Sequence, residues 1–371
     1  MPTTQAPLQL LTPEGRLIED DSTAEALAVV AELSDDDLQR MHREMVVARR
    51  FDLEAINLQR QGQLALWVPS LGQEGAQIGS AFATRGQDHV FPSYREAVVA
   101  YHHGLDPMRL IEYWRGMTLG GWDPREVGNF HLYTLVIGAQ TLHAAGFAMG
   151  QLFDGLTGTG DPGTDAATIV YFGDGSTSEG DTNEAMIWAA SFQAPLVMFL
   201  QNNHWAISVP VTTQSRTPLF HRPEGFGIPA VQIDGNDALA SYAATRLALD
   251  AARAGRGPRF IEALTYRMGA HTSSDDPTKY RTDDDTAPWA ARDPLTRFEA
   301  FLRARGAGEE FFADVEREAL DVAAGIRRGT FELGEPPQSR MFDHVYSEPH
   351  PLIATQKQWL ADYEASFGGA A

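Results

Sequence analysis

ATIVYFGDGSTSEGDTNEAMIWAASFQAPLVMFLQNN, residues 167–203, contains the pattern that best predicts the fold. Its two apolar runs, ATIVYF (167–172) and PLVMFL (195–200), are rich in β-branched and aromatic residues, as strands buried on both faces are. Between them, 173–181 has the composition of a turn and 184–192 that of a helix. A strand, a helix and a strand within about 35 residues predict a parallel βαβ unit.

The same alternation continues toward the C-terminus. AVQIDG (230–235) and PRFIEALTYR (258–267) have the composition of strands, with a predicted helix over 237–254 between them. We therefore predict an α/β fold, with a doubly wound parallel sheet that has helices on both faces. Further helices are predicted over 23–32, 34–62, 70–84, 94–118 (broken at 104–107), 137–153 and 293–328. We expect loops over 119–136 and 268–292 and an irregular tail beyond 328.

Three regions follow from this pattern. Residues 1–33 are expected to form an N-terminal arm that lies on the surface or on a partner. Residues 34–292 form the predicted α/β domain, and 293–371 form a C-terminal helical extension and tail. Ser34 and Asp37 have the spacing of a capping box, which predicts the start of the first long helix.

The composition argues against several classes of protein. Of 371 residues, 29 are Lys or Arg and 50 are Asp or Glu, which gives a formal net charge of −21. That charge disfavours binding to nucleic acids or anionic membranes, since both need clustered basic residues. The chain has no cysteine, which excludes disulfides, thiolate metal sites and a cysteine nucleophile. No run of 18 apolar residues and no basic, apolar leader is present, so we expect a cytoplasmic protein that does not span a membrane.

Polar residues follow both strands predicted within residues 167–203. Asp174 comes after the first strand and Asn203 after the second, 29 positions later. Because the carboxyl ends of parallel strands meet at one edge of a sheet, these side chains can face one point. A carboxylate, an amide oxygen and a nearby carbonyl form a set that suits Mg²⁺ carrying phosphate oxygens. The helix that follows Gly175 offers free N–H groups to the same phosphates.

Other nucleotide and hydrolase motifs do not fit this chain. GTGDPG (158–163) matches G-x-G-x-x-G, but a predicted helix precedes it and a predicted strand follows it, so we expect a loop. The patterns G-x-x-x-x-G-K-[ST], H-E-x-x-H and G-x-S-x-G are absent.

Several motifs in the chain resemble those of a known enzyme family. GDGSTSEGD…NN (173–203) resembles the motif of thiamine-diphosphate enzymes. More narrowly, the chain is similar to the alpha subunit of the decarboxylating component of 2-oxo acid dehydrogenase complexes. The similarity extends over about residues 35–350 and includes GQEGAQIGSA (72–81), FPSYREA (91–97), IGAQTLHAAG (137–146), FGIPAVQIDGND (226–237), YRMGAHTSSDDPTKYR (266–281) and DPLTRFEAFL (293–302).

The resemblance implies thiamine diphosphate and Mg²⁺ as cofactors, and it implies roles for particular residues. Asp174 and Asn203 match the side-chain metal ligands, and Trp205 matches the residue that gives a backbone carbonyl. His271 matches a catalytic histidine implicated in acyl transfer to a lipoyl group. The positions that match cofactor-binding residues are Ser93, Tyr94, Arg95, Ile137, Gly173, Gly175, Ser176, Thr177, Ser178, Glu179, Gly180, Asp181, Asn203, Ala206, Ile207 and His271.

The expected reaction is the oxidative decarboxylation of a 2-oxo acid, with transfer of the acyl group to a lipoyl group. Leu66 and Tyr94 are the predicted substrate contacts. Branched-chain relatives often carry an aromatic residue at the position of Leu66 and glutamine at that of Ser93, which favours pyruvate here. A branched-chain 2-oxo acid dehydrogenase or an acetoin dehydrogenase alpha subunit is the alternative. A non-catalytic regulatory subunit is a further one, and the presence of Asp174, Asn203, Arg95 and His271 argues against it.

The expected partners are a beta subunit, in an α₂β₂ heterotetramer, and the lipoyl domain of the acyltransferase component. Thiamine-diphosphate chemistry also needs a site that grips the aminopyrimidine and supplies a glutamate, and no second parallel-sheet domain is predicted in this chain. Glu74 lies in a predicted helix and is expected to be structural. The small-residue helices predicted over 70–84 and 137–153 suit close packing between subunits. Gln201 stands where some relatives carry an arginine just before the two asparagines.

Overall fold

The computed structural model describes residues 6–118 and 121–367. Residues 119–120 of the predicted loop and the outer ends of the predicted arm and tail lie outside the described residues. The strands are β1 (His89–Phe91), β2 (Thr168–Gly173), β3 (Leu196–Asn202), β4 (Trp205–Ala206), β5 (Val209–Pro210), β6 (Ala230–Asp234) and β7 (Arg259–Leu264). The helices are α1 (Ala24–Val30), α2 (Asp35–Arg60), α3 (Glu74–Phe82), α4 (Ala97–His102), α5 (Pro107–Arg115), α6 (Ala139–Phe153), α7 (Gly180–Phe192), α8 (Val211–Gln214), α9 (Ala238–Arg253), α10 (Asp283–Ala290), α11 (Pro294–Ala304), α12 (Glu309–Glu332) and α13 (Pro351–Ala365).

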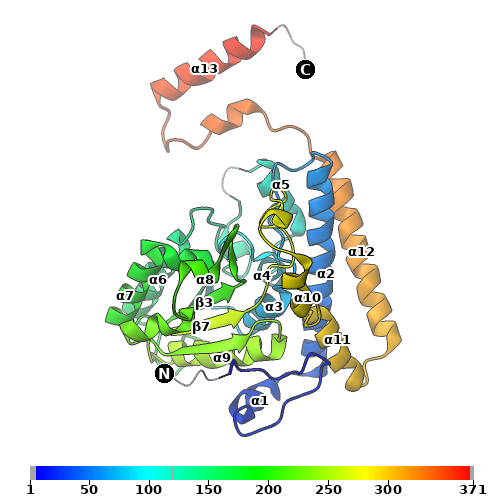
Figure 1. The fold of residues 1–371 in the computed structure, drawn as a ribbon. Helices are drawn as coiled ribbons and strands as arrows, with labels where there is room; N and C mark the ends of the chain where they lie inside the picture. The colour runs from blue at the N-terminus through cyan, green and yellow to red at the C-terminus, as the bar shows by residue number, and fades with distance from the viewer. Residues whose placement is uncertain (1–5, 119–120, 368–371) are drawn as a thin grey trace.

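A parallel sheet with the strand order β1-β2-β3-β7-β6 forms the centre of the fold (Figure 1). Every neighbouring pair in it runs parallel, as in the register that sets Ile169 beside Val197. Alternate residues of a strand face opposite layers: Ile169 and Tyr171 share a core with α2, α3 and α9, whereas Val170 and Phe172 pack under α6 and α7. This confirms the predicted doubly wound α/β fold with helices on both faces.

Small residues let α3 pack closely on α9. All residues from Glu74 to Ala81 are buried, and a Cβ atom on Gly79 would lie 2.2 Å from the carbonyl oxygen of Ala238. The small residues of α3 therefore serve packing within the chain, which corrects the expectation that this helix suits contact between subunits. The outer face of α6 differs, because a Cβ atom on Gly146 or Gly150 would meet no heavy atom within 4 Å.

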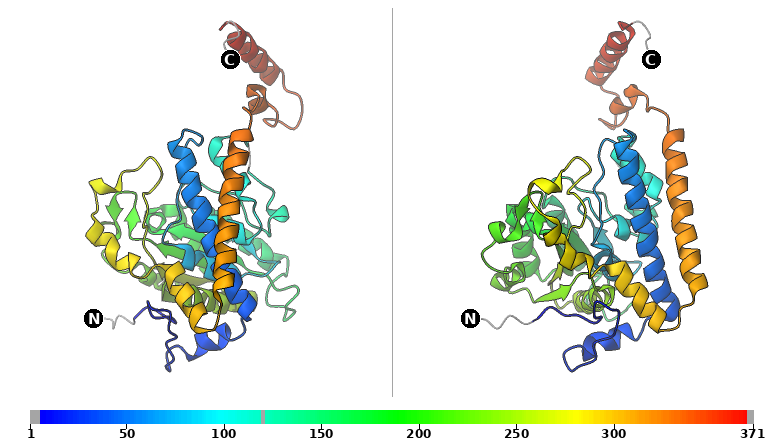
Figure 2. Two further views of the ribbon diagram at one scale, coloured as in Figure 1. Left: turned by 90° about the vertical axis from the view of Figure 1, so that its right-hand side faces the viewer. Right: turned by 45° about the vertical axis from the view of Figure 1, so that its right-hand side comes forward.

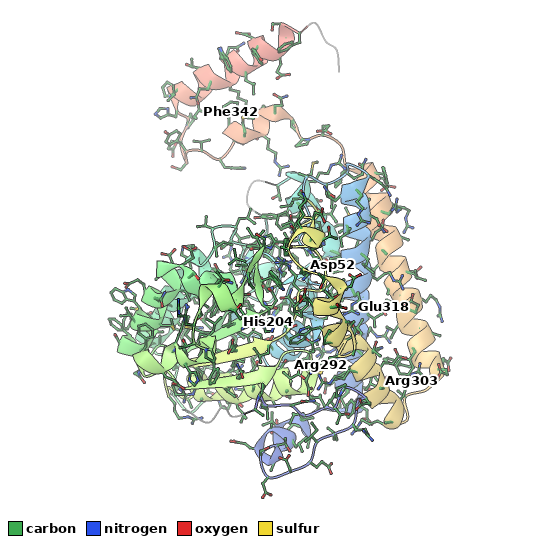
Figure 3. All side chains as sticks on the ribbon, in the orientation of Figure 1. Asp52, His204, Arg292, Arg303, Glu318 and Phe342 are labelled. Atoms are coloured by element: carbon green, nitrogen blue, oxygen red, sulfur yellow. The ribbon has the colours of Figure 1, made fainter. Side chains whose placement is uncertain are left out.

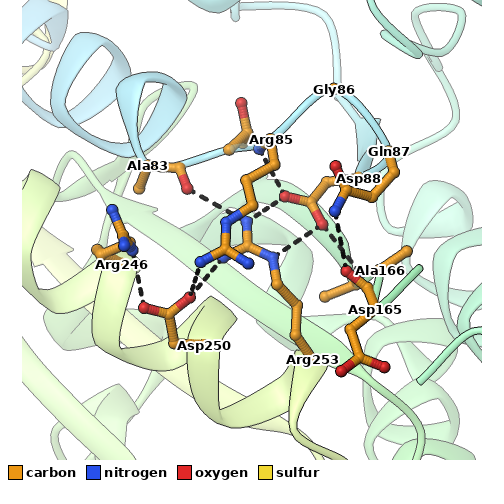
Figure 4. A network of polar contacts seen from close by, with 12 residues as sticks. Ala83, Arg85, Gly86, Gln87, Asp88, Asp165, Ala166, Arg246, Asp250 and Arg253 are labelled. Atoms are coloured by element: carbon orange, nitrogen blue, oxygen red, sulfur yellow. Dashed lines mark hydrogen bonds and ion pairs between the residues drawn. The ribbon is translucent and has the colours of Figure 1, made fainter. Parts of the chain in front are cut away.

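Charged side chains tie the elements together at the amino ends of the strands. Asp88, which precedes β1, accepts hydrogen bonds from Arg253 of α9 and from the backbone N–H of Arg85 and Ala167 (Figure 4). Asp250 accepts further bonds from Arg85 and Arg253. Both the Asp88 and the Arg253 side chains are buried, so this network is structural and leaves the opposite edge of the sheet free for a site.

The N-terminal arm packs on its own chain. Leu8 forms a bridge with Ile233 of β6, and Leu10 and Leu11 are fully buried. The backbone N–H groups of Leu10 and Leu11 donate to Asp237 at 2.7 and 2.6 Å. The predicted arm over 1–33 is therefore partly core, because these leucines cover the edge strand of the sheet.

Helices α11 and α12, which follow residue 293, pack against the first long helix, α2. Figure 2 shows α12 (orange) running next to α2 (blue). Ion pairs join the two helices, as between Arg327 and Glu54 at 2.7 Å. The capping box of Ser34 and Asp37 begins α2, as predicted. The domain boundaries at 34 and 293 stay a prediction.

Several predicted ranges need correction. The loop predicted over 268–292 contains α10, whose start is capped by Thr282 and Asp285, and the tail expected to be irregular contains α13. Strand β1 was not predicted from the sequence, and GTGDPG (158–163) is a loop, as expected. None of the helices in the described ranges combines the length and apolar character needed to cross a membrane.

Candidate active site

A cavity opens at the carboxyl ends of β2 and β3. Its walls come from six parts of the chain: the start of α3, the turn after β1, the start of α6, the turn after β2, the end of β3 with the turn after it, and the loop after β7. The lining residues are Gln73, Ser93, Tyr94, Arg95, Glu96, Ile137, Gln140, Gly173, Asp174, Gly175, Ser176, Glu179, Gln201, Asn203, Trp205, Ala206, Ile207 and His271. The strand order brings the turns after β1, β2, β3 and β7 to one edge of the sheet, since these strands are neighbours in that order.

The cavity gathers most of the residues singled out in the sequence. All three predicted metal ligands, His271, and the cofactor positions Ser93, Tyr94, Arg95, Ile137, Gly173, Gly175, Ser176, Glu179, Ala206 and Ile207 line it. Thr177, Ser178, Gly180 and Asp181 do not, and neither does Leu66, which packs partly buried against the main core. The functional roles of all these residues stay predictions.

The turn after β2 buries a carboxylate. Strand β2 ends at Gly173, a 3₁₀ turn covers Asp174–Ser178, and α7 begins at Gly180. The Asp174 side chain is 1% exposed, and burial raises its pKa to about 6. Its Oδ2 accepts a hydrogen bond from the Gln214 amide at 2.9 Å, and no cationic side chain of the described residues pairs with it. A Cβ atom on Gly175 would lie 3.0 Å from that of Ala206, so glycine keeps this wall close.

The turn after β3 is held in a strained conformation. His204 has a φ of 69° and Ile207 a φ of 53°, in the left-handed region that a β-branched residue rarely adopts. Arg267, just beyond β7, fixes this turn by donating to the carbonyl oxygens of Trp205 at 3.2 Å and Ile207 at 2.7 Å. Asn203 Oδ1 accepts the backbone N–H of Trp205 at 3.2 Å. Strain of this kind persists where the surrounding structure enforces it, as at binding sites.

Two guanidinium groups meet at His271. Arg95 Nη2 lies 3.1 Å from His271 Nδ1 and donates to its carbonyl oxygen at 2.9 Å, and Arg267 Nη1 lies 3.4 Å from the same Nδ1. Guanidinium groups only donate, so Nδ1 accepts and the neutral ring carries its proton on Nε2. Burial, together with Arg95 and Arg267, lowers the pKa of His271 to about 3, and burial lowers that of Arg267 to about 10.

These charges and polar atoms fit a ligand that carries a diphosphate and a divalent cation. Arg95 and Arg267 form no ion pair with any carboxylate of the described residues, and Arg95 lines the cavity, so its positive charge lies there without a counter-charge. Gln73 Nε2 and Gln140 Oε1 are buried without a hydrogen-bond partner. Buried polar groups are rarely left in this state, so a polar ligand is expected between them.

The three predicted metal ligands carry little negative charge. Asp174 is the single carboxylate among them, beside the Asn203 amide and the Trp205 carbonyl. Among the described residues, no group of three or more histidine and acidic side chains is arranged to hold a metal ion.

Reasoning from the sequence missed part of the lining. Gln73, Glu96 and Gln140 are absent from the predicted site, although each lies inside a motif that carries the resemblance: GQEG, SYREA and IGAQT. Gln214 and Arg267, which hold Asp174 and the turn after β3, were also missed. The adjacency of Glu96 to Arg95 is the signal that could have pointed to it.

Known proteins resemble this chain along most of its length. Residues 42–321 match the family described as dehydrogenase E1 component. The chain is 40% identical over 357 residues to 3-methyl-2-oxobutanoate dehydrogenase subunit alpha of Mycobacterium tuberculosis (strain CDC 1551 / Oshkosh), covering 95% of this chain and 93% of that protein. It is 37% identical over 339 residues to pyruvate dehydrogenase E1 component subunit alpha of Bacillus cereus, covering 91% and 86%.

A third relative shows the same extent of similarity. The pyruvate dehydrogenase E1 component subunit alpha of Staphylococcus aureus (strain Mu50 / ATCC 700699) is 38% identical over 324 residues, which are 86% of this chain and 83% of that protein. Since both the family match and these relatives span the sheet, the cavity and most of the helices, this chain belongs to the dehydrogenase E1 component family.

Proposed function

We propose that this chain is the alpha subunit of a thiamine-diphosphate-dependent 2-oxo acid dehydrogenase. The observation that carries the proposal is the meeting of Asp174, Asn203, Arg95 and His271 in one cavity at the strand ends. These are side chains for a metal, a phosphate and a reacting centre, drawn from four separate segments. A degenerate, non-catalytic subunit would not need to keep all four.

The residues that line the cavity have separate proposed roles. Asp174, Asn203 and the Trp205 carbonyl would hold Mg²⁺, and Arg95 would bind the diphosphate, since guanidinium groups bind phosphate oxygens in a bidentate way. Ile137 would contact the aminopyrimidine. When bound, thiamine diphosphate supplies the carbanion that attacks the 2-oxo carbon. The chain orients that cofactor and excludes water around it.

His271 has a defined hydrogen-bonding role in this geometry. Its Nδ1 accepts from the two arginines, so Nε2–H is the group left to donate toward the cavity. A bound diphosphate would offset the positive field of Arg95 and Arg267, which raises the pKa of the imidazole toward its usual range. We propose that His271 serves acyl transfer to the lipoyl domain of an acyltransferase component.

The partner subunit would cover α6 and α7. Phe153, Trp188 and Phe192 form a continuous aromatic cluster with ring centroids 5.7 to 5.9 Å apart, and each ring is substantially exposed. Val136, just before α6, is 68% exposed. Apolar surface of this extent is typical of a protein interface. A beta subunit docked here in an α₂β₂ assembly would supply the glutamate that the cofactor needs.

The substrate proposal is pyruvate, with a branched-chain 2-oxo acid as the second candidate. Ser93 lines the cavity, which supports a role in selecting the substrate, whereas Leu66 does not line it. The second candidate is favoured by the 40% identity to a 3-methyl-2-oxobutanoate dehydrogenase subunit, against 37 and 38% for the pyruvate dehydrogenase subunits. One methylene more or less in a pocket changes selectivity by about 1–3 kcal/mol, so activity on both acids is expected.

One experiment tests the function and the substrate together. The chain is copurified with its beta partner, loaded with thiamine diphosphate and Mg²⁺, and assayed for decarboxylation with an artificial electron acceptor. We expect turnover of pyruvate with a higher kcat/KM than that of 3-methyl-2-oxobutanoate. The reverse order would assign the branched-chain substrate, and no cofactor-dependent turnover of either acid would refute the proposed function.

A further inference from the structure

The turn that carries Tyr94 and Arg95 is closed by the residue that follows them. Glu96 Oε2 accepts the backbone N–H of Ser93 at 2.8 Å and that of Arg95 at 3.2 Å. Both carboxylate oxygens also accept the Ser93 hydroxyl, at 3.1 and 3.3 Å. The Glu96 side chain is 1% exposed although it borders the cavity. Its oxygens are thus used within the chain, which leaves it poorly placed to act as a free base.

Two amide side chains extend this contact into the sheet. Gln201 at the end of β3 donates its Nε2 to Glu96 Oε1 at 2.7 Å. The Gln201 Oε1 accepts from Gln77 Nε2 of α3 at 3.1 Å, and Gln77 Oε1 accepts the backbone N–H of Val98 at 3.2 Å. Gln77 Nε2 also donates to the carbonyl of Arg95 at 3.1 Å. Since a carboxylate only accepts, the direction of every bond in this network is fixed.

The Arg95 side chain then spans the mouth of the site. Its Nη1 donates to the Pro69 carbonyl at 2.5 Å, and its Nη2 reaches the carbonyl and Nδ1 of His271. Backbone and side chain of Arg95 are therefore fixed from opposite ends. The backbone end depends on Glu96, Gln201 and Gln77.

We propose that Glu96, through Gln201 and Gln77, is a positioning residue that aims Arg95 at the diphosphate of the cofactor. The inference rests on the proposed function, in which Arg95 binds that diphosphate. A carboxylate is needed at 96 because four donors converge on it: two backbone N–H groups, one hydroxyl and one amide. A neutral amide at this position would turn one of its atoms into a donor and leave the Gln201 amide facing another donor.

The test exchanges the two side chains. Glu96→Gln and Gln201→Glu are made singly and together in the full chain, with any partner that copurifies. In the double variant, the amide placed at position 96 would donate to the carboxylate placed at position 201. That carboxylate would still accept from Gln77, and the buried charge would be unchanged. Binding of inorganic diphosphate and of thiamine diphosphate, each with Mg²⁺, is measured by calorimetry, and thermal unfolding is followed in parallel.

We expect each single variant to bind both ligands roughly tenfold more weakly and the double variant to recover affinity to within about threefold of the unchanged chain. In the decarboxylation assay, the KM for thiamine diphosphate should rise in the single variants while kcat at saturating cofactor changes little. Where a single variant does not fold, the double variant decides, because folding and near-normal binding in it support the coupling.

Asp88→Asn is the matched control. Asp88 is another buried carboxylate that accepts backbone N–H groups, but it lies at the amino ends of the strands, away from the cavity. It should lower the unfolding temperature without changing diphosphate affinity. Unchanged binding in Glu96→Gln, or a double variant as weak as the weaker single one, would overturn the inference alone. No binding of either ligand by the unchanged chain would overturn the proposed function, and the inference with it.

Discussion

The cavity and the C-terminal arm, defined as residues 333–367, are built in opposite ways. In the cavity, polar side chains are buried and linked to each other, as with Glu96, Gln201 and Arg95. In the arm, apolar side chains are exposed: Trp359 is 64% and Phe367 61% accessible, and both rings contact Tyr363 of the same helix end. Figure 3 shows the arm around Phe342 standing apart from the crowded side chains of the body.

This difference indicates which part of the molecule is complete without a partner. The body buries its strands on both faces, and Gln73 and Gln140, whose buried polar atoms lack a partner, lie at the cavity. Helix α13 has no packed core of its own, and an isolated helix of 15 residues is marginal in water. We infer that the body encodes the cofactor site, whereas the arm gains its order from another surface.

The largest effect should come from the metal side of the cavity. Asp174→Ala removes the single carboxylate of the predicted Mg²⁺ set, and a charge-assisted contact of about 3 kcal/mol corresponds to roughly a hundredfold in affinity. We expect at least that loss in thiamine-diphosphate binding by calorimetry, with the fold intact by circular dichroism. Asp321→Ala, on the exposed side of α12 and outside the cavity lining, is the control and should bind normally. Equal binding by both variants would contradict the assigned metal ligand.

Removal of the arm tests its independence from the body. A chain ending at Leu333 should keep the cofactor affinity of the full chain and an unfolding temperature within a few degrees of it, because few contacts tie the arm to the described body: a hydrogen bond from Arg340 to the Met117 carbonyl and an ion pair of Glu335 with Arg115 at 3.9 Å. Association with the beta subunit should weaken at least tenfold by analytical ultracentrifugation. A large fall in cofactor affinity would show that the arm belongs to the site.

His271 should separate two half-reactions rather than abolish both. With its neutral ring held by Arg95 and Arg267, it is placed to donate from Nε2 during acyl transfer. We expect His271→Ala to slow reductive acylation of a lipoyl domain roughly a hundredfold and decarboxylation with an artificial acceptor less than tenfold. His271→Asn retains a hydrogen-bond donor, so its rate of reductive acylation should lie between that of the unchanged chain and that of His271→Ala. The same loss in both assays would remove this division of labour.

The smallest expected effect is on the pH dependence of the stability of the body. His42 is 2% exposed against Phe311 and Phe312, and burial lowers its pKa to about 4. The unfolded histidine binds a proton below about pH 6.5, but the folded one does not until about pH 4, so stability falls as pH falls through this window. His42→Leu should recover about 1–2 kcal/mol of that loss at pH 5, in urea unfolding at pH 5 and 7.5. The arm-free chain should show the same pH dependence as the full chain. A variant with an unchanged pH slope would contradict the role of His42.

The sequence could predict the strand-end site because strand adjacency follows from the βαβ pattern. The nearness of Asp174 and Asn203 could be predicted from their positions alone, because each follows a buried strand. Thr177, Ser178, Gly180 and Asp181 were included because they continue the same motif, but the 3₁₀ turn that begins at Asp174 leaves them outside the lining. A linear motif does not tell which side of a turn a residue occupies.

Other elements could not be predicted from the sequence, for physical reasons. Strand β1 has only three residues, His89–Phe91, too few for a periodic pattern. Helix α10 contains Pro288 and an acidic first turn, which together have the composition of a loop. The partner of Glu96 on β3 could not be predicted, because Gln201 lies 105 positions away and only the folded chain brings its amide to the carboxylate.

The exposed linker between α12 and α13 has a practical consequence for handling the protein. Residues 333–350 cross open solvent with little regular structure, and extended, accessible segments of this kind are where proteases cut first. A preparation made without its beta partner would accumulate a ragged product that ends near residue 340, with the cavity and the sheet intact. Mass spectrometry of stored samples would therefore show clipped and full-length forms, and the ratio of the two would record how much of the chain had been kept unassembled.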